Sequence, residues 1–234
     1  MRRKILFVIW LTVLHIFLAA DYQKKHQGRF VSRYLDQQAR PQTIPLCSQD
    51  RSSYHLSCIK NDLYGQPWIV QKTRGVSGWN IQLGKIQDGK IKGRISVSQD
   101  VGGNNMSPDL EFTSGNQPWA AWVNQYHGFW RLYVQNTSTS QTWEVTSAKR
   151  PLFTPDIIAD KTGRVWVFWT GVQSGYDQIF VSYLEYGTWS RPETLTPDSS
   201  VPHFHPAVTL NEFGYPLAVW SSFTRTGYRL YSSY

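Results

Sequence analysis

Two short motifs each place a carboxylate directly after a proline, where it could take part in acid–base chemistry. They are S-P-D-L (107–110) and T-P-D-I (154–157), and Glu111 stands two residues after Asp109. Two carboxyls that face one cleft, such as Asp109 and Asp156, can act as general acid and general base in glycoside hydrolysis. Alternatively, an aspartate at the start of a strand accepts backbone N–H bonds in a turn. We favour this structural role, because a catalytic site rarely repeats its acid in successive copies of a motif.

Aromatic side chains beside arginines form a second group that could bind a ligand. An indole face stacks on the apolar C–H face of a sugar ring, while a guanidinium donates hydrogen bonds to the hydroxyls. The alternative is packing between neighbouring sheets, with arginine stems lying over the rings. The candidate ligand-binding residues are Trp79, Trp130, Arg131, Tyr228, Arg229 and Trp189.

The histidines and cysteines give weaker indications of a functional site. His203 and His205 would share one face of an extended strand, but no further metal ligands accompany them, and a polar loop with incidental histidines is the preferred interpretation. Cys47 and Cys58 could be bridged in an oxidising compartment, adding about 3 kcal/mol. However, their predicted strands are three spacings of about 4.8 Å apart. Whether Cys47 and Cys58 form a disulfide is therefore left undecided by the sequence. We expect neither a metal nor another cofactor.

A repeat organises these positions. In the copy centred on Trp166, a proline stands 11 residues before the centre, a glycine 3 before, a tryptophan 3 after and an isoleucine 13 after. Successive centres are 51, 47 and 51 residues apart. Strand-only repeats of this length favour propeller blades. The sequence therefore predicts an all-β chain, a β-propeller of four four-stranded blades. The four centres are Trp68, Trp119, Trp166 and Leu217.

Within each copy we expect three strands and, after a variable turn, a fourth. The second strand carries the centre and the residue 3 after it on opposite faces, as in a blade buried between two others. Fourth strands should end near Val97, Val145 and Leu195, and Leu46 holds the matching place before the first copy. The segment Gln42–Cys47 is therefore expected to complete the last blade and close the ring. A ring completed by a second chain is the alternative.

The repeats resemble those of the sialidase-like (BNR/Asp-box) β-propeller superfamily over residues 42–234. The resemblance rests on the two proline–aspartate motifs, on G-x-x-W-x-x-W (163–169) and on Y-G-T-W-S-R-P-E-T-L-T (186–196). The last stretch lies where that family places S-x-D-x-G-x-T-W, and it keeps only the Gly, Thr and Trp. The resemblance implies the propeller fold. A sialidase-type mechanism needs several inner-strand arginines, and the predicted first strands have none, so sialidase activity is not expected.

The first 20 residues read as a signal peptide or signal anchor, because Arg2, Arg3 and Lys4 precede the uncharged apolar run Ile5–Ala20. A basic linker (21–41) and the propeller domain (42–234) follow. We therefore expect the body outside the cytoplasm, whether secreted, periplasmic or anchored. Residues 1–40 carry eight Lys/Arg and two Asp/Glu, which leaves sixteen and fourteen for the rest. This nearly neutral body argues against nucleic acid as a partner, and a membrane is expected only at the N-terminal segment.

Three functions remain open on sequence. The first, which we prefer, is an exported, non-catalytic binding module for a glycan or an extracellular protein, as a monomer or a ring-completing dimer. The second is a glycoside hydrolase of sialidase- or arabinanase-like type that uses inner-strand carboxylates. The third is a structural remnant that needs a second chain.

Overall fold

A computed structural model describes residues 57–76, 78–196 and 199–233, all of them within one compact unit, Gln49–Tyr234. Every regular element in these ranges is a β-strand, as the sequence predicts. The described residues contain no helix of the length and hydropathy that a membrane span requires. The predicted leader, the linker and the closing segment Gln42–Cys47 lie outside these residues.

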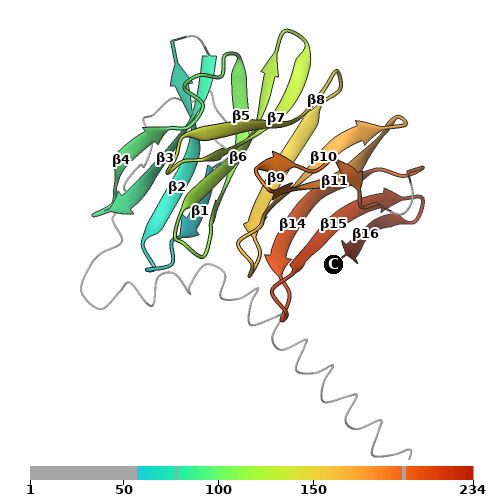
Figure 1. Ribbon diagram of the computed structural model, residues 1–234. Helices are drawn as coiled ribbons and strands as arrows, with labels where there is room; N and C mark the ends of the chain where they lie inside the picture. Colours follow the sequence, from blue (N-terminus) through green and yellow to red (C-terminus); the bar gives the residue numbers. More distant parts are fainter. Residues whose placement is uncertain (1–56, 77, 197–198, 234) are drawn as a thin grey trace, which may run out of the picture. The chain divides into compact units, whose positions relative to one another are not determined.

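The described strands form three hydrogen-bonded sheets, and in the first of them a single parallel pairing of Trp79 with Asn104 joins two antiparallel groups. For description we divide the strands into four consecutive antiparallel groups and call them blades 1 to 4 (Figure 1). Blade 1 contains β1 (Ser57–Asn61), β2 (Pro67–Gly75), β3 (Gly78–Gln87) and β4 (Lys90–Ser96). Blade 2 contains β5 (Asn104–Phe112), β6 (Pro118–Tyr126), β7 (Phe129–Asn136) and β8 (Gln141–Ala148). Blade 3 contains β9 (Leu152–Ala159), β10 (Val165–Gln173), β11 (Tyr176–Glu185) and the short β12 (Thr188–Trp189) and β13 (Glu193–Thr194). Blade 4 contains β14 (His203–Leu210), β15 (Pro216–Thr224) and β16 (Gly227–Ser233).

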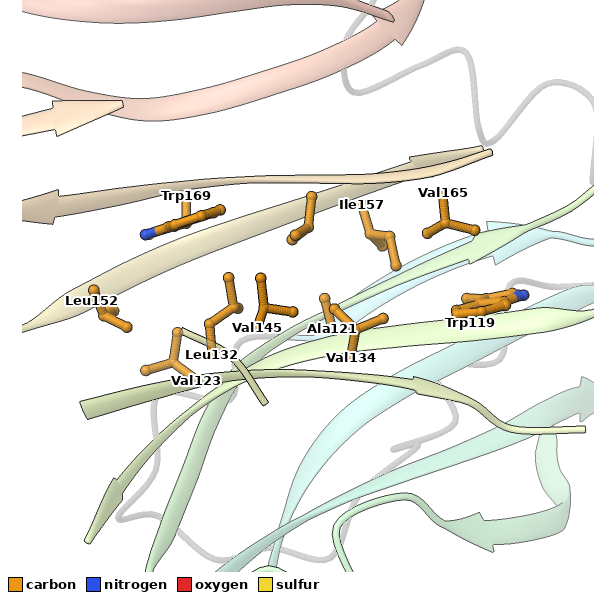
Figure 2. Close-up of a cluster of buried hydrophobic side chains, with 11 residues drawn as sticks. Trp119, Ala121, Val123, Leu132, Val134, Val145, Leu152, Ile157, Val165 and Trp169 are labelled. Atoms are coloured by element: carbon orange, nitrogen blue, oxygen red, sulfur yellow. The ribbon is translucent and has the colours of Figure 1, made fainter. Parts of the chain in front are cut away.

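The core lies between neighbouring blades, as expected of sheets stacked face to face. The predicted opposite orientation of the two second-strand positions is confirmed. Trp119 packs in the cluster between blades 2 and 3, while Trp122 packs in the cluster between blades 1 and 2. Likewise, Trp169 packs toward blade 2 and Trp166 toward blade 4. Figure 2 shows the cluster between blades 2 and 3, where alternate residues of β6 and β7 meet those of β9 and β10.

The turns between first and second strands share their backbone hydrogen bonds but differ in the side chain at the turn's first position, which is an aspartate in blade 3. Asp160 Oδ1 accepts the N–H groups of Thr162 and Arg164, and its Oδ2 accepts the indole N–H of Trp166 at 2.9 Å. Burial alone would raise the pKa of Asp160, but these hydrogen bonds lower it below its usual value. The repeated glycine fills the position of positive φ in this turn, where a Cβ is strained. The residues at that position are Gly65 (φ 77°), Asn116 (φ 55°), Gly163 (φ 84°) and Gly214 (φ 78°).

One face of blade 4 is not covered by any of the residues that the structure describes. The position 13 residues after the centre is fully buried in blades 1 to 3 by the blade that follows, yet Leu230 is 76% exposed. Neither a fourth strand of blade 4 nor a following blade is present among the described residues. The structure therefore supports a propeller-like all-β fold, while a closed four-bladed ring stays a prediction.

Candidate functional site

The first strands of blades 2, 3 and 4 each contain a β-bulge. The pairing of first and second strands shifts register near Pro108, Pro155 and Pro206. A proline has no N–H to give to the ladder and is tolerated at such irregularities. The residue before each proline has a positive φ: 50° at Ser107, 42° at Thr154 and 58° at His205. Left-handed backbone at a non-glycine residue costs roughly 1–2 kcal/mol, and such strain is concentrated at functional sites.

The bulges carry a chain of hydrogen bonds that links the first strands. Asp109 Oδ2 accepts the Ile157 N–H of blade 3 at 2.8 Å, and Asp156 Oδ2 accepts the Val208 N–H of blade 4 at 2.8 Å. Cys58, at the same place in blade 1, forms hydrogen bonds with the Leu110 backbone and the Asp109 carboxyl. The aspartates do accept backbone N–H groups. The sequence analysis places the donors of these bonds in a turn, but they belong to the first strand of the next blade.

The two aspartates also meet each other. Burial, the negative charge of Asp109 and a hydrogen bond with that carboxyl raise the pKa of Asp156 to about 7, against a usual value of 3.8. Burial and the same Asp109 charge raise the pKa of the Cys58 thiol to about 12, which makes it a poor nucleophile. The pair lies in a hollow of about 200 Å³ whose walls come from the two proline–aspartate motifs and Pro206.

Carboxyls in hydrogen-bond contact are closer together than the geometry of glycoside hydrolysis requires. Retaining enzymes hold their two carboxyls about 5–5.5 Å apart, and inverting enzymes about 6.5–9.5 Å apart. The Asp109–Asp156 pair instead resembles a dyad that shares one proton. Such a dyad can hold or release a proton near neutral pH, but it leaves no room for a glycosidic bond between its members.

A larger hollow of about 440 Å³ lies toward the C-terminal ends of the first strands. We call it the axial cavity, because β1, β5, β9 and β14 all contribute to its lining. Lys60 Nζ pairs with Glu111 Oε2 at 2.8 Å, and Glu111 Oε1 accepts the Phe112 N–H at 2.7 Å. Apolar side chains, among them Leu63 and Leu210, complete the wall. The third candidate carboxylate, Glu111, is thus occupied by a cation.

The predicted aromatic–arginine pairs do not form one site. Trp130 packs at 5.9 Å against Phe153 of blade 3. Arg131 pairs with Glu144 at 3.4 Å. For these two residues the model places the side chains in packing and ion-pair contacts within and between blades.

The remaining candidates lie apart. Trp189 is in the short strand β12 and packs against the cluster between blades 2 and 3, with its buried Nε1 lacking a partner among the described residues. Tyr228 is 74% exposed on β16, and the neighbouring Arg229 bonds to Thr226. Trp79 borders a separate hollow between blades 1 and 2.

The two candidate histidines do not face a common site, and the described cysteine forms no disulfide. His203 is fully buried, and its Nδ1 accepts the indole N–H of Trp220 at 3.0 Å, whereas His205 is exposed on the bulge. The bulge thus removes the shared face that two-residue spacing suggests. The described ranges contain no group of three or more His, Cys, Asp or Glu side chains suited to a metal. Cys58 is a free thiol, and Cys47 lies outside the described residues.

No family model and no curated protein matches this sequence. Among solved structures, the chain is similar to an endo-arabinase from Bacteroides thetaiotaomicron, with a TM-score of 0.50 and 12% identity over 75% of this chain and 72% of that one. It is similar to a thermostable family-43 glycoside hydrolase with the same score and identity, over 75% and 70% of the two chains. At this identity the likeness shows the fold alone. The class is thus an all-β, propeller-like protein, and the sialidase-like resemblance is supported only at the level of the propeller.

Sequence reasoning missed Lys60 and the contact between the two aspartates. A signal existed, because Cys58, Asp109 and Asp156 all stand ten residues before a repeat centre, and Lys60 and Glu111 both stand eight before. Equivalent places on adjacent first strands are close in a propeller, so a comparison of copies could have paired these residues.

Proposed function

We propose that this protein is a carbohydrate-binding propeller that holds its ligand in the axial cavity without cleaving it. The observation that carries the proposal is the cavity itself, which combines the Lys60–Glu111 ion pair with apolar side chains at the point where four strands converge. The hydroxyls of a sugar ring can form hydrogen bonds with the ion pair, and its C–H faces can pack against the apolar side chains. The two structural neighbours named above are glycoside hydrolases, which supports a saccharide as the ligand class.

The direct test is a glycan panel with the full chain. Ser114 is exposed and lines the cavity, so Ser114→Trp should block the cavity and weaken binding at least tenfold. Ser138→Trp, on the exposed turn between β7 and β8, is the matched control and should bind like the wild type. Binding that survives Ser114→Trp would place the ligand elsewhere, and a blank panel from folded protein would reject a carbohydrate ligand.

One observation favours the alternative, a glycoside hydrolase. Asp156 keeps its proton near neutral pH, and a protonated carboxyl is what a general acid requires. Hydrolysis of aryl arabinosides and xylosides that is lost in Asp156→Asn would establish this function in place of pure binding.

We further propose that the protein works outside the cytoplasm, with residues 1–20 as its leader, and that Gln42–Cys47 supplies the fourth strand of blade 4. The leader's charge and hydropathy support the first point. Leu46 supports the second, because it holds the place of Val97 and Leu195 in the repeat. N-terminal sequencing of the exported protein tests the leader, and amide exchange of β16 in an Ile44→Asp, Leu46→Asp variant tests the closure.

A further inference from the structure

A third hollow, of about 280 Å³, lies between blades 1 and 2, beside the hairpin of β2 and β3. Ligand pockets usually measure about 300–1,000 Å³, so this one suits a single sugar ring rather than a long chain. It forms where β3 meets β5 in a single parallel pairing, between Trp79 and Asn104. The lining residues are Arg74, Gly75, Val76, Gly78, Trp79 and Asn104.

Strand register brings cations to this place. Arg74 pairs directly with Trp79 across the hairpin, and Lys72 lies two residues earlier on the same face. Further along β2, that face continues into Val70 and Trp68, which belong to the core between blades 1 and 2. The groove therefore changes from an apolar core to a basic and aromatic rim.

The rim contains positive charge without a partner carboxylate. Lys72 Nζ lies 4.3 Å from the centroid of the Trp79 ring. Neither Lys72 nor Arg74 forms an ion pair with any described residue, and no carboxylate lines the hollow. Burial lowers the pKa of Lys72, and a bound anion would act in the opposite direction by favouring the charged ammonium. Arginine binds carboxylate and sulfate groups through paired N–H donors.

The other blades do not repeat this arrangement. In blade 2 the place of Trp79 is taken by Trp130, and Phe153 of the next blade packs against it. The places of Lys72 and Arg74 hold uncharged residues there and in blade 3, so those grooves have no basic rim. The replacing residues are Val123 and Gln125 in blade 2, and Thr170 and Val172 in blade 3.

Glycine fixes the depth of the hollow. Gly78 has a φ of 144°, and a Cβ there would lie 2.6 Å from the Gly103 carbonyl oxygen. Only glycine lets the hairpin approach blade 2 this closely, and that approach places the Asn104 amide beside Trp79 and Arg74.

We propose that this rim binds an anionic saccharide, a sugar ring that carries a carboxylate or a sulfate. The Trp79 ring contacts the C–H face, Arg74 and Lys72 bind the acidic group, and the Asn104 amide bonds to a hydroxyl. The assignment rests on the proposed carbohydrate-binding function and adds to it a second subsite with its own ligand class.

Calorimetric titration of the full chain tests the assignment with three disaccharides of similar size: digalacturonate, a sulfated heparin disaccharide and neutral cellobiose. We expect Arg74→Gln and Lys72→Gln each to weaken binding of an acidic disaccharide at least tenfold and to leave cellobiose binding unchanged. Arg74 is exposed and Lys72 half-buried, so the variants should fold, and Arg94→Gln on exposed β4 is the matched control. A response to digalacturonate identifies a carboxylate as the acidic group, whereas a response to the heparin disaccharide alone, which carries both groups, identifies a sulfate.

Each contrary result has a separate meaning. Equal binding of acidic and neutral disaccharides, or equal effects of Arg74→Gln and Arg94→Gln, would overturn this subsite while leaving the axial cavity as a neutral-sugar site. Sodium sulfate that binds as tightly as the sulfated disaccharide, and equally well to Trp79→Leu, would reduce the site to a plain anion site. A folded protein that binds no saccharide would overturn both proposals, whereas acidic binding that persists in Ser114→Trp supports the rim alone.

Discussion

Asp156 makes the stability of the protein depend on pH. The folded chain keeps a proton on this carboxyl up to about pH 7, whereas the unfolded chain releases it near the usual value of 3.8. Between these two values the folded state binds more protons than the unfolded state. The contribution of Asp156 to the free energy of unfolding therefore falls as the pH rises through this window. Below and above the window this contribution does not change with pH.

We expect Asp156→Asn to abolish this slope. The asparagine Oδ1 can still accept the Val208 N–H, and its amide can donate to Asp109 without a second negative charge. At pH 8 the variant should be more stable than the wild type by roughly 1–3 kcal/mol. Urea unfolding at pH 4, 6 and 8 measures it, with the exposed Asp100→Asn as control. An unchanged slope in the variant would show that other groups set the pH dependence.

The turn between first and second strands is the element that differs most instructively among copies. Blade 1 repeats the arrangement of blade 3, with Asp62 accepting the Trp68 indole N–H at 3.1 Å. Blade 2 has Thr113 at that place, and the buried Trp119 Nε1 has no partner in the described part of the chain. A buried donor without an acceptor costs about 1–3 kcal/mol.

Thr113→Asp should therefore stabilise the protein by about 1 kcal/mol, because it supplies the acceptor that blades 1 and 3 possess. Thr113→Asn is the matched control. Its single oxygen can accept the turn N–H groups, as Asn211 does in blade 4, but it offers nothing further to the indole. Thermal unfolding of the three proteins gives the comparison. Equal stability of the Asp and Asn variants would mean that the indole N–H is already satisfied, for example by water.

At this scale the sequence predicted much of the fold. The repeat frame placed the strands, and the three-residue spacing of Trp119 and Trp122 correctly put them on opposite faces, because that alternation is a property of the strand itself. The site was harder. Whether an aromatic residue such as Trp130 or Trp79 packs or lines a hollow depends on what the next blade places against it. The Asp109–Asp156 contact likewise depends on how blades dock, so it follows from comparing equivalent positions in two copies and not from either motif alone.

Across the whole molecule, packing is uneven from one end to the other. Blades 2 and 3 are each covered on both faces by neighbours, whereas no described residue covers the far face of blade 4. We expect Leu132→Ala, in the core between blades 2 and 3, to cost about 2–5 kcal/mol in the free energy of unfolding. Leu230→Ala, the equivalent change in blade 4, should cost less than about 0.5 kcal/mol.

Urea unfolding of the full chain measures both losses. A large loss for Leu230→Ala would show that this face is covered in solution. Repeating the measurement over a range of protein concentrations then shows whether a second copy or a segment of the same chain covers the face. A loss that grows with concentration indicates a second copy, and a constant loss indicates closure within one chain.

The hydrogen bonds between first strands have a direction. Each acceptor, Asp109 or Asp156, precedes its donor in the next blade by about one repeat, 48 and 52 residues respectively. During synthesis, each blade therefore leaves the ribosome with its acceptor carboxylate before the donor N–H of the next blade has been made. The chain can dock its blades in the order of their synthesis, which limits the time that any strand edge stays exposed. Ala207 holds this place in blade 4 and has no side-chain acceptor, so the series of links ends there.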